Sequence, residues 1–284
     1  MDSRRYQSEL CRYRMIFDLH THTRFSRGGR EITHAKGTLE QTVEEARNKG
    51  LSAIGISNHG PGHITYGMPI AAVEELKRQR DQLQEKYSDI RILIGVEANI
   101  IDLSGDLDVS SAQCKQFDYV LAGYHYGIFG KAPCSAALLH GANWMWEASG
   151  GRRRLERALQ AEEAAREHPV LRGRLIERNT QCMTAAILKN RPTAVTHPGD
   201  KMPCDIRAVA KACEIAGTWM EINDSHRDLS VENLRRAAEY DVTFVIGSDA
   251  HGPKRAGCFA EGLARLLEAG VDPARVVNIA EKTR

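Results

Sequence analysis

The stretch from Phe17 to Ser26 reads FDLHTHTRFS and places His20 and His22 two residues apart at the end of a short apolar run. In a β-strand, alternate side chains point to the same face of the sheet, so we expect the two imidazoles to converge. Asp18 lies one step deeper, where a carboxylate commonly holds the other ring nitrogen of a histidine ligand. By itself, this pair is equally consistent with ordinary hydrogen-bonded polar residues.

Seven segments have the apolar, β-branched composition of buried strands, and helical patterns separate most of them. In chain order they read MIFDLH, SAIGISNH, RILIGVEAN, DYVLAGYH, TAVTHP, TWMEIN and VTFVIGSDAH. This alternation predicts a parallel sheet whose outer face is covered by helices. For a chain of 284 residues, we expect an α/β fold with one domain over residues 1–284, a distorted TIM-like (β/α)7 barrel.

Capping residues mark the ends of several predicted helices. Thr38 and Gln41 have the spacing of a capping box, and Gly50 stands where a glycine typically follows a helix. Asp205 and Ser230 are expected to cap the N-termini of two later helices.

A helical insertion is expected at about residues 126–178, because this stretch interrupts the rhythm of strand and helix. It contains RRRLERALQAEEAAREH, which has the mixed charges of an exposed helix, and NWMWE, which holds Trp144 and Trp146. Loops at the carboxyl ends of barrel strands set specificity. The insertion is therefore interpreted either as an aromatic lid over a bound substrate or as an exposed decoration that includes a subunit contact.

The overall composition excludes several classes of function. With 39 basic and 37 acidic residues, no net field attracts nucleic acid or an anionic membrane. The first residues lack the apolar core of a signal peptide and no later stretch is apolar enough to span a bilayer, so we expect a cytoplasmic protein. The seven cysteines form no CxxC pair, which favours reduced thiols over disulfides or a cysteine zinc site.

Potential metal ligands close six of the seven predicted strands. In a parallel barrel, the carboxyl ends of all strands surround one mouth, so these side chains should meet there. Imidazole and carboxylate without thiolate suit zinc, manganese or iron, and this many ligands exceeds the needs of one ion. The residues are His20, His22, His59, Glu97, His125, His197, Asp249 and His251.

The strings DLHTHT, NHG, GVEAN, GYH, THPG and SDAH, in this order, resemble the polymerase and histidinol phosphatase (PHP) superfamily, most closely its single-domain, trinuclear-zinc phosphatases. The resemblance extends from about Ile16 to the last predicted helix. It implies three divalent ions, with zinc as the first choice and manganese or iron as alternatives. One ion would be held by His20, His22, Glu97 and Asp249, a second by Glu97, His125 and His197, and a third by His59, His251 and His34.

Two features depart from the pattern of this family. The loop between His22 and His34 looks longer than usual because it contains RGGRE, which makes His34 the least secure of the ligands. The second strand usually ends in Asp-His, whereas this chain has Asn58 before His59. Asparagine supplies no negative charge, so the third ion is expected to be held more weakly.

The resemblance implies a metal-dependent phosphoesterase that hydrolyses a small phosphate ester, such as histidinol phosphate or a nucleotide, through a metal-bridged hydroxide. Glu97, His197 and Asp249 would be the catalytic residues. No GxSxG elbow, P-loop or dinucleotide-binding fingerprint competes with this prediction. The alternatives are a nuclease or phosphodiesterase of the same superfamily, which would need a basic stripe, and a non-catalytic module, which would show gaps among the ligands.

Basic residues follow three of the strand ends and are candidates to clamp phosphate oxygens. They are Lys201, Arg227 and Arg255, and Asn223 is a further candidate to orient a ligand. The histidines outside the motifs are expected to be ordinary surface or loop residues, namely His63, His140, His168 and His226. The expected partner is a small phosphorylated substrate, without membrane or nucleic acid, and the oligomeric state stays open.

Overall fold

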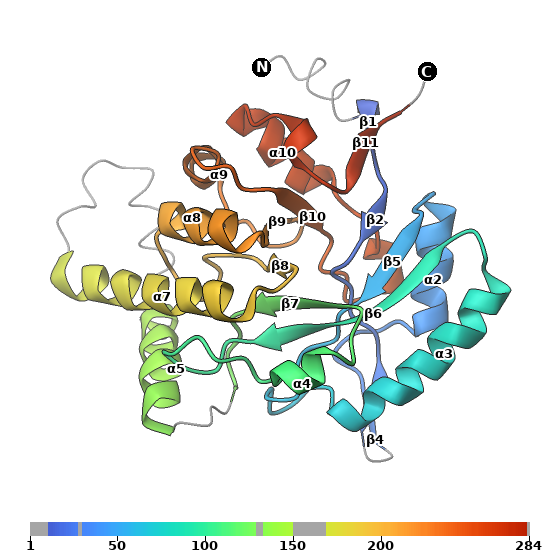
Figure 1. The fold of residues 1–284 in the computed structure, drawn as a ribbon, viewed down its shortest axis with the longest axis horizontal. Coiled ribbons are helices and arrows are strands. Elements are labelled where there is room, and N and C mark those ends of the chain that lie inside the picture. Colours follow the sequence, from blue (N-terminus) through green and yellow to red (C-terminus); the bar gives the residue numbers. More distant parts are fainter. Residues whose placement is uncertain (1–10, 28–29, 129–132, 150–168, 283–284) are drawn as a thin grey trace.

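The computed structural model describes residues 11–27, 30–128, 133–149 and 169–282. A seven-stranded sheet forms its centre (Figure 1), and the order of strands in the sheet follows the order in the chain. All neighbouring strands are parallel, as expected for strands joined by helices. The strands are β2 (Phe17–Asp18), β5 (Ala53–Ile56), β6 (Arg91–Asn99), β7 (Tyr119–Gly123), β8 (Ala194–Val195), β9 (Trp219–Asn223) and β10 (Phe244–Gly247). All seven lie within the predicted segments.

The two outer strands of the sheet, β2 and β10, approach each other and nearly close a barrel. Beyond their carboxyl ends, the backbone N–H of His22 donates to the carbonyl of Ala250 over 2.8 Å. Farther back, the buried side chain of Asn278 donates to the carbonyls of Phe17 and Ile246, over 2.8 and 2.7 Å. The Asn278 amide thus replaces ladder hydrogen bonds that the short β2 does not make, and the expected distorted TIM-like barrel is confirmed.

Helices surround the sheet (Figure 1) and turn their apolar sides toward it. The N-caps predicted at Thr38, Asp205 and Ser230 are confirmed, and Thr38 forms the full capping box with Gln41. The α-helices are α2 (Leu39–Asn48), α3 (Val73–Lys86), α4 (Ser111–Cys114), α5 (Pro133–Ala148), α7 (Pro169–Asn190), α8 (Ile206–Ala216), α9 (Val231–Ala237) and α10 (Ala260–Ala269). Short 3-10 turns are η1 (Ile70–Ala72), η3 (Pro253–Arg255) and η4 (Pro273–Arg275).

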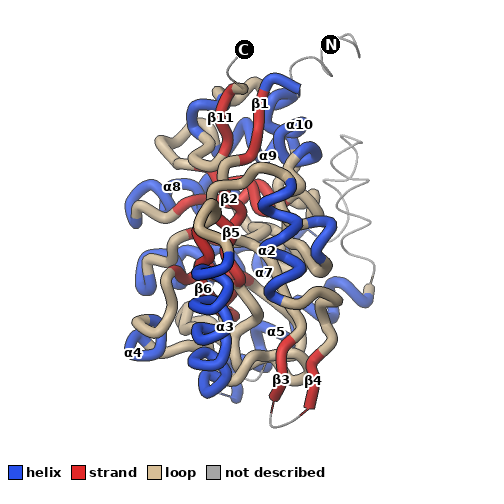
Figure 2. The backbone as a smooth tube through the Cα atoms, turned by 90° about the vertical axis from the view of Figure 1, so that its right-hand side faces the viewer, coloured by secondary structure: helices blue, strands red, loops and turns tan. Residues whose placement is uncertain are grey.

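Two small antiparallel pairs, absent from the predicted set of strands, flank the barrel (Figure 2). Strand β1 (Tyr13–Met15) pairs with β11 (Ile279–Glu281), which joins the two ends of the described chain. Strands β3 (Phe25–Arg27) and β4 (Arg30–Ile32) form a ribbon out of the long loop that precedes His34. The described part of this loop therefore forms an antiparallel pair of strands before the chain returns to the mouth of the barrel.

Helices α5 and α7 occupy the described parts of the expected insertion. They are joined by a reciprocal, buried amide pair, in which Asn143 and Asn179 donate to each other over 3.0 and 2.8 Å. The segment RRRLERALQAEEAAREH lies outside the described residues. Trp144 is 62 % exposed, so the aromatic lid stays a prediction.

Two further expectations concern the cysteines and a membrane. Six cysteines in the described part of the chain are free thiols, namely Cys11, Cys114, Cys182, Cys204, Cys213 and Cys258. No helix within the described ranges combines the length and the apolar character that a membrane span requires.

Candidate metal centre

The carboxylate of Glu97, at the end of β6, lies at the centre of a cluster of imidazole rings. This side chain is fully buried. Its Oε1 lies 2.9 Å from His197 Nε2, 3.3 Å from His20 Nε2 and 3.5 Å from His125 Nε2. Its Oε2 lies 3.1 Å from His59 Nδ1 and 3.6 Å from His22 Nε2. Five strand ends therefore bring histidines or the carboxylate itself to one point, as the alternation of strands and helices predicts.

A second carboxylate, Asp249, completes the side of the cluster that follows β10. Its Oδ1 lies 3.3 Å from His22 Nε2, 3.5 Å from His20 Nε2 and 3.4 Å from His251 Nδ1. His34 is the outermost of the predicted ligands. Its Nε2 lies 2.9 Å from Nε2 of His251, so this ring also reaches the cluster.

The donor set fits divalent cations. Four groups of three residues place one ligand atom each within 4.8 Å of the others, and together they include every predicted ligand except His34. Several of these buried atoms have no hydrogen-bond partner among the residues that the structure describes, which is costly unless another group satisfies them. They are His20 Nε2, both nitrogens of His22 and of His59, and Glu97 Oε2. Nitrogen and carboxylate ligands of this kind suit zinc and related ions.

Two strand residues orient the imidazoles from behind. Glu221 Oε1 lies 2.6 Å from His20 Nδ1, which directs the ring's Nε2 toward the cluster. Asn99 Oδ1 lies 2.8 Å from His125 Nδ1 and has the same effect on that ring. Glu221 also accepts a hydrogen bond of 2.7 Å from the backbone N–H of His197. One carboxylate in the middle of β9 thus fixes the residues that follow two other strands, β2 and β8.

The role expected for Asp18 is wrong, because its carboxylate does not reach an imidazole nitrogen. Asp18 instead accepts backbone hydrogen bonds from His20, Ser248 and Gly257, over 3.1, 3.4 and 2.9 Å. The missed partner, Glu221, had one visible signal, since it is a charged residue inside the otherwise apolar strand segment TWMEIN.

Electrostatics in the cluster keep its two carboxylates in the ionised form, which is the form that binds cations. Burial opposes ionisation of Glu97, but His125, His20 and His197 hold the pKa of its carboxyl well below the usual range. Asp249 is also buried, and His20 and His22 likewise keep its pKa well below the ordinary value.

In four of the imidazole rings, burial is the largest effect on the pKa and favours the neutral form. It lowers the pKa of His59 to about 3 and holds that of His125 well below its ordinary value. Those of His34 and His251 fall to about 4, again mainly through burial. For these four rings, the neutral form is the one with a free lone pair for a metal ion.

Asn58, which replaces the usual aspartate, secures the backbone after β2. Its Oδ1 accepts from the N–H of Thr23 over 2.8 Å, and its Nδ2 donates to the Thr23 hydroxyl over 3.2 Å. Both contacts suit a neutral amide, which has a donor and an acceptor. Next to it, His59 receives no hydrogen bond from Asn58 within the described chain.

Among the remaining histidines, the expectation of an ordinary surface or loop residue is wrong for His226, which contacts a proposed metal ligand. His226 lies between two carboxylates, with Nε2 3.2 Å from Asp249 Oδ2 and Nδ1 3.4 Å from Asp200 Oδ2. His63 is buried and stacks on Tyr66. His140 packs on Tyr124 from α5, and His168 lies outside the described residues.

The four predicted substrate-binding residues separate into different environments. Arg227 is 72 % exposed and pairs with Glu261, so its role in substrate binding stays a prediction. Lys201 contacts Asp200 over 2.8 Å and its charge influences the pKa of both His125 and His197. Asn223 donates to Glu221 and Asp249, over 3.0 and 3.3 Å, and thus orients carboxylates. The fourth residue, Arg255, lines a pocket beside the cluster.

Backbone strain is concentrated at this site. Among the described residues other than glycine, the four with positive φ are Arg191, His197, Lys201 and Asp249. Three of these four belong to the cluster or its rim. Such conformations persist where the surrounding structure enforces them, which is typical of functional sites.

The comparisons with known proteins agree with this geometry. The family model of the PHP domain matches residues 18–163. A probable phosphatase of Thermoanaerobacter sp. (strain X514) is 31 % identical over 274 residues, covering 93 % of this chain and 91 % of that protein. The probable phosphatase YcdX of Escherichia coli (strain K12) is 26 % identical over 279 residues, covering 93 % and 90 %.

One solved structure with the same fold is the histidinol phosphate phosphatase HisK of Lactococcus lactis, complexed with zinc, L-histidinol and phosphate. The TM-score is 0.56 at 17 % identity, over 91 % of this chain and 95 % of that one. A putative histidinol phosphatase of Listeria monocytogenes gives a TM-score of 0.55 at 16 % identity, over 85 % and 97 %. At these identities, the likeness concerns the fold alone.

Proposed function

Since this chain belongs to the PHP domain family and is thereby a metal-dependent phosphatase or phosphoesterase, we propose that it hydrolyses a small phosphate ester at a centre of three divalent ions. The observation that carries the proposal is the buried Glu97, which contacts five imidazoles while several of the facing ligand atoms have no hydrogen-bond partner within the described chain. A single ion would leave many of these atoms unsatisfied.

We assign the ligands as three sets, of which the first two share Glu97. His20, His22, Glu97 and Asp249 would hold one ion, Glu97 with His125 and His197 a second, and His34, His59 and His251 a third. The contact distances around Glu97 and Asp249 support the first two sets, and the contact of 2.9 Å between His34 and His251 supports the third. Zinc is the first candidate, because the donors are imidazole and carboxylate.

The metal ions, when bound, lower the pKa of water and stabilise charge on the attacking and leaving oxygens of an in-line displacement. The protein's own contribution is to fix geometry and charge. Glu97 and Asp249 stay ionised, and Glu221 and Asn99 hold His20 and His125 in one ring orientation. His197 would serve with Glu97 and Asp249 at the reacting centre, since its backbone and ring are both held there.

Lys201 is the residue that we assign to the phosphate oxygens. Its ammonium is held by Asp200, and it lies close enough to affect the pKa of His125 and His197. A cation fixed beside the site of reaction stabilises negative charge that develops on non-bridging oxygens.

A panel of phosphate esters tests the proposal with purified enzyme reconstituted with zinc or manganese. It should contain p-nitrophenyl phosphate, nucleoside monophosphates, histidinol phosphate and one phosphodiester. We expect hydrolysis of at least one monoester, loss of activity on chelation, and recovery when zinc or manganese is restored. Activity that survives after elemental analysis shows the ions removed would refute the proposal. Preference for the diester would favour the phosphodiesterase alternative.

A further inference from the structure

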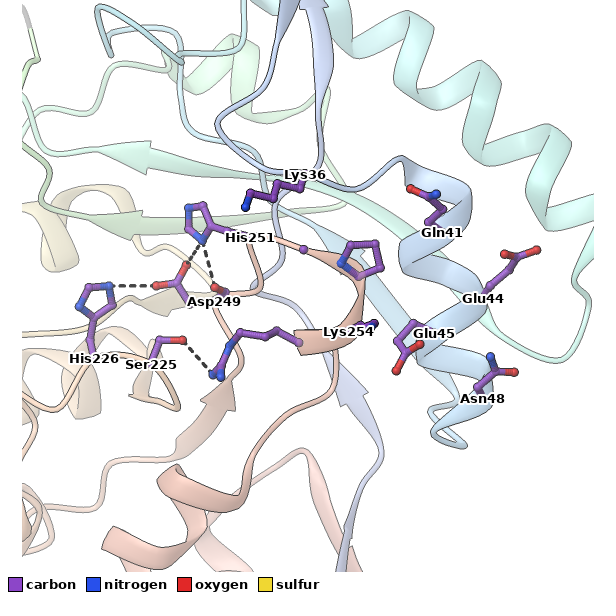
Figure 3. A pocket seen from close by; sticks show the side chains of 13 residues that line it. Lys36, Gln41, Glu44, Glu45, Asn48, Ser225, His226, Asp249, His251 and Lys254 are labelled. Atoms are coloured by element: carbon purple, nitrogen blue, oxygen red, sulfur yellow. Dashed lines mark hydrogen bonds and ion pairs between the residues drawn. The ribbon is translucent and has the colours of Figure 1, made fainter.

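A pocket of about 900 Å³ opens directly from the metal centre (Figure 3). Asp249 and His251 form its inner end, and the loop before α2, the helix α2, the loop after β9 and the turn η3 supply its other walls. This volume lies in the range of small-molecule sites, which is roughly 300–1,000 Å³, and exceeds what a phosphate group alone needs. The pocket is therefore sized for the part of a substrate beyond the scissile phosphate.

Two of the positively charged side chains that line this pocket have no partner among the described residues. Lys36 and Lys254 have no hydrogen-bond or ion-pair partner for their ammonium groups within the described ranges. The carboxylates Glu44 and Glu45 do have partners, since Tyr87 donates to Glu44 over 2.7 Å and Lys49 lies 3.4 Å from Glu45. An anionic ligand would find unpaired cations here, whereas a cationic ligand would compete with existing partners.

Lys36 is held at the inner end of the pocket by its backbone. Its N–H donates to the carbonyl of His251 over 3.0 Å, and the next residue, Gly37, accepts from the N–H of Arg24 over 2.8 Å. Gly37 also packs so closely on Pro253 that a side chain there would collide with the proline ring. Figure 3 shows the Lys36 side chain pointing toward His251. Its position next to the metal centre is thus built into the fold.

Arg255 is held by its side chain. Its Nη2 donates to Asp224 over 3.1 Å and to the Ser225 hydroxyl over 3.0 Å. The contact with Ser225 is drawn as a dashed line in Figure 3. Asp224 is itself buried and accepts from the N–H of Gly262 over 3.0 Å. This leaves Nη1 and Nε of Arg255 without an acceptor among the residues described. A guanidinium fixed in this way presents its remaining donors to a carboxylate or phosphate at little cost in conformational entropy.

We propose that this pocket binds a second anionic group of the substrate, a carboxylate or a second phosphate, through Lys36 and Arg255. The preferred substrate is then a phosphate ester that carries another anion a few bonds from the scissile phosphate. This inference rests on the proposed function, because the first phosphate is placed at the metal centre. It assigns Arg255 to specificity, in place of the clamp on the scissile phosphate that its position after β10 suggested.

Binding of matched phosphonates to the metal-loaded protein tests the inference without any turnover. 3-Phosphonopropionate and propylphosphonate differ by one carboxylate, and 3-aminopropylphosphonate carries an amine instead. We expect the carboxylate compound to bind about tenfold more tightly than propylphosphonate, as a charge-assisted hydrogen bond allows. Equal affinities, no measurable binding of either, or tighter binding of the amine would overturn the proposal.

Two variants locate the effect. Lys36→Met and Arg255→Gln should each reduce the tenfold ratio toward one, because each removes one partner of the second anion. Lys211→Met serves as the matched control, since Lys211 is exposed on α8 and lies outside the pocket lining. A ratio that neither pocket variant changes would place the preference elsewhere and refute the assignment.

Kinetics separate this inference from the function on which it rests. 3-Phosphoglycerate carries a carboxylate at the position where glycerol 3-phosphate carries a hydroxymethyl group. The value of kcat/KM should therefore favour 3-phosphoglycerate by a similar factor. Hydrolysis of both at equal efficiency would remove the second anionic subsite while the phosphoesterase function stands. Absence of hydrolysis across the whole ester panel, with metals bound, would remove the proposed function, and the phosphonate titration would still decide whether the pocket selects anions.

Discussion

The metal centre has two halves that are built differently. The deep half consists of His20, Glu97, His125 and His197, all of which are buried and stand on or directly after barrel strands. The open half consists of His34 and His251, which stand on loops, and the side chain of His251 is 37 % exposed. In the deep half, Glu221 and Asn99 orient two of the rings from behind. In the open half, each of the two rings has the other as its neighbour at 2.9 Å.

The difference shows how rigidity is distributed in this site. Side chains on paired strands inherit fixed positions from the sheet, whereas loop side chains depend on local contacts. His34 follows the β3–β4 ribbon and stacks on Tyr66, with ring centroids 3.7 Å apart. We therefore expect the deep half to hold its ions tightly and the open half to exchange its ion more readily.

The largest expected effect comes from Glu97→Gln, because it removes the carboxylate that the first two proposed ligand sets share. The variant should lose most bound metal, and its activity should fall by more than the roughly 10–100-fold expected for an outer partner. The barrel should remain folded, since glutamine has nearly the same size. Elemental analysis, the phosphatase rate and circular dichroism check these outcomes. Full metal content with full activity would disprove the bridging assignment.

A smaller loss is expected from Glu221→Gln, which removes the charge behind His20 without touching a proposed ligand atom. Partners of this kind typically contribute about 10–100-fold to metal affinity or activity. Glu239→Gln is the matched control, because Glu239 is exposed in a surface pair with Arg207, and such pairs contribute little. If the two variants behave alike in metal titrations, Glu221 does not orient the deep half.

The open half is tested by His34→Ala together with graded chelation. This variant should lack at most one ion per chain and keep the ions of the deep half, because His34 contacts neither Glu97 nor Asp249 directly within the described structure. In the unmodified protein, a limiting amount of chelator should remove one ion before the others. Elemental analysis at each step is the measurement. A variant that retains all ions would return His34 to the class of ordinary loop residues.

The smallest effect on activity is expected at Asp108, which supports the deep half indirectly. Asp108 accepts from the backbone N–H groups of Gly62 and Asn99, over 2.8 and 2.9 Å, and also from the Asn99 side chain, which contacts His125. Burial raises the pKa of Asp108 from 3.8 to about 6. Because the folded pKa lies above the unfolded value, this group stabilises the fold most below about pH 4, and that contribution declines up to about pH 6.

Denaturant unfolding of metal-free protein measures this linkage. The stability of the wild type relative to Asp108→Asn, whose side chain does not titrate, should fall by up to about 3 kcal/mol between pH 4 and pH 7. A difference that does not vary with pH would show that Asp108 titrates normally.

Two arginines illustrate where prediction from the sequence stops. Arg227 and Arg255 both follow a strand end, and the sequence offers no basis for separating them. In the structure, Arg227 pairs with the exposed Glu261, whereas Arg255 is held by the buried Asp224 beside the metal centre. A long, flexible side chain takes its direction from partners that are distant in the sequence, and those partners are known only after folding.

The sequence by itself determined the seven strands, the helix caps and the ligand types at the strand ends, because periodicity, capping and side-chain chemistry are local properties. The parallel barrel then required these ligands to meet, whatever the details of their contacts. Only the tertiary structure decided that Glu221 rather than Asp18 orients His20, that His226 reaches Asp249, and that Lys36 and Arg255 share one pocket. These are contacts between segments up to about two hundred residues apart, and their geometry depends on how the strands are packed rather than on any local pattern.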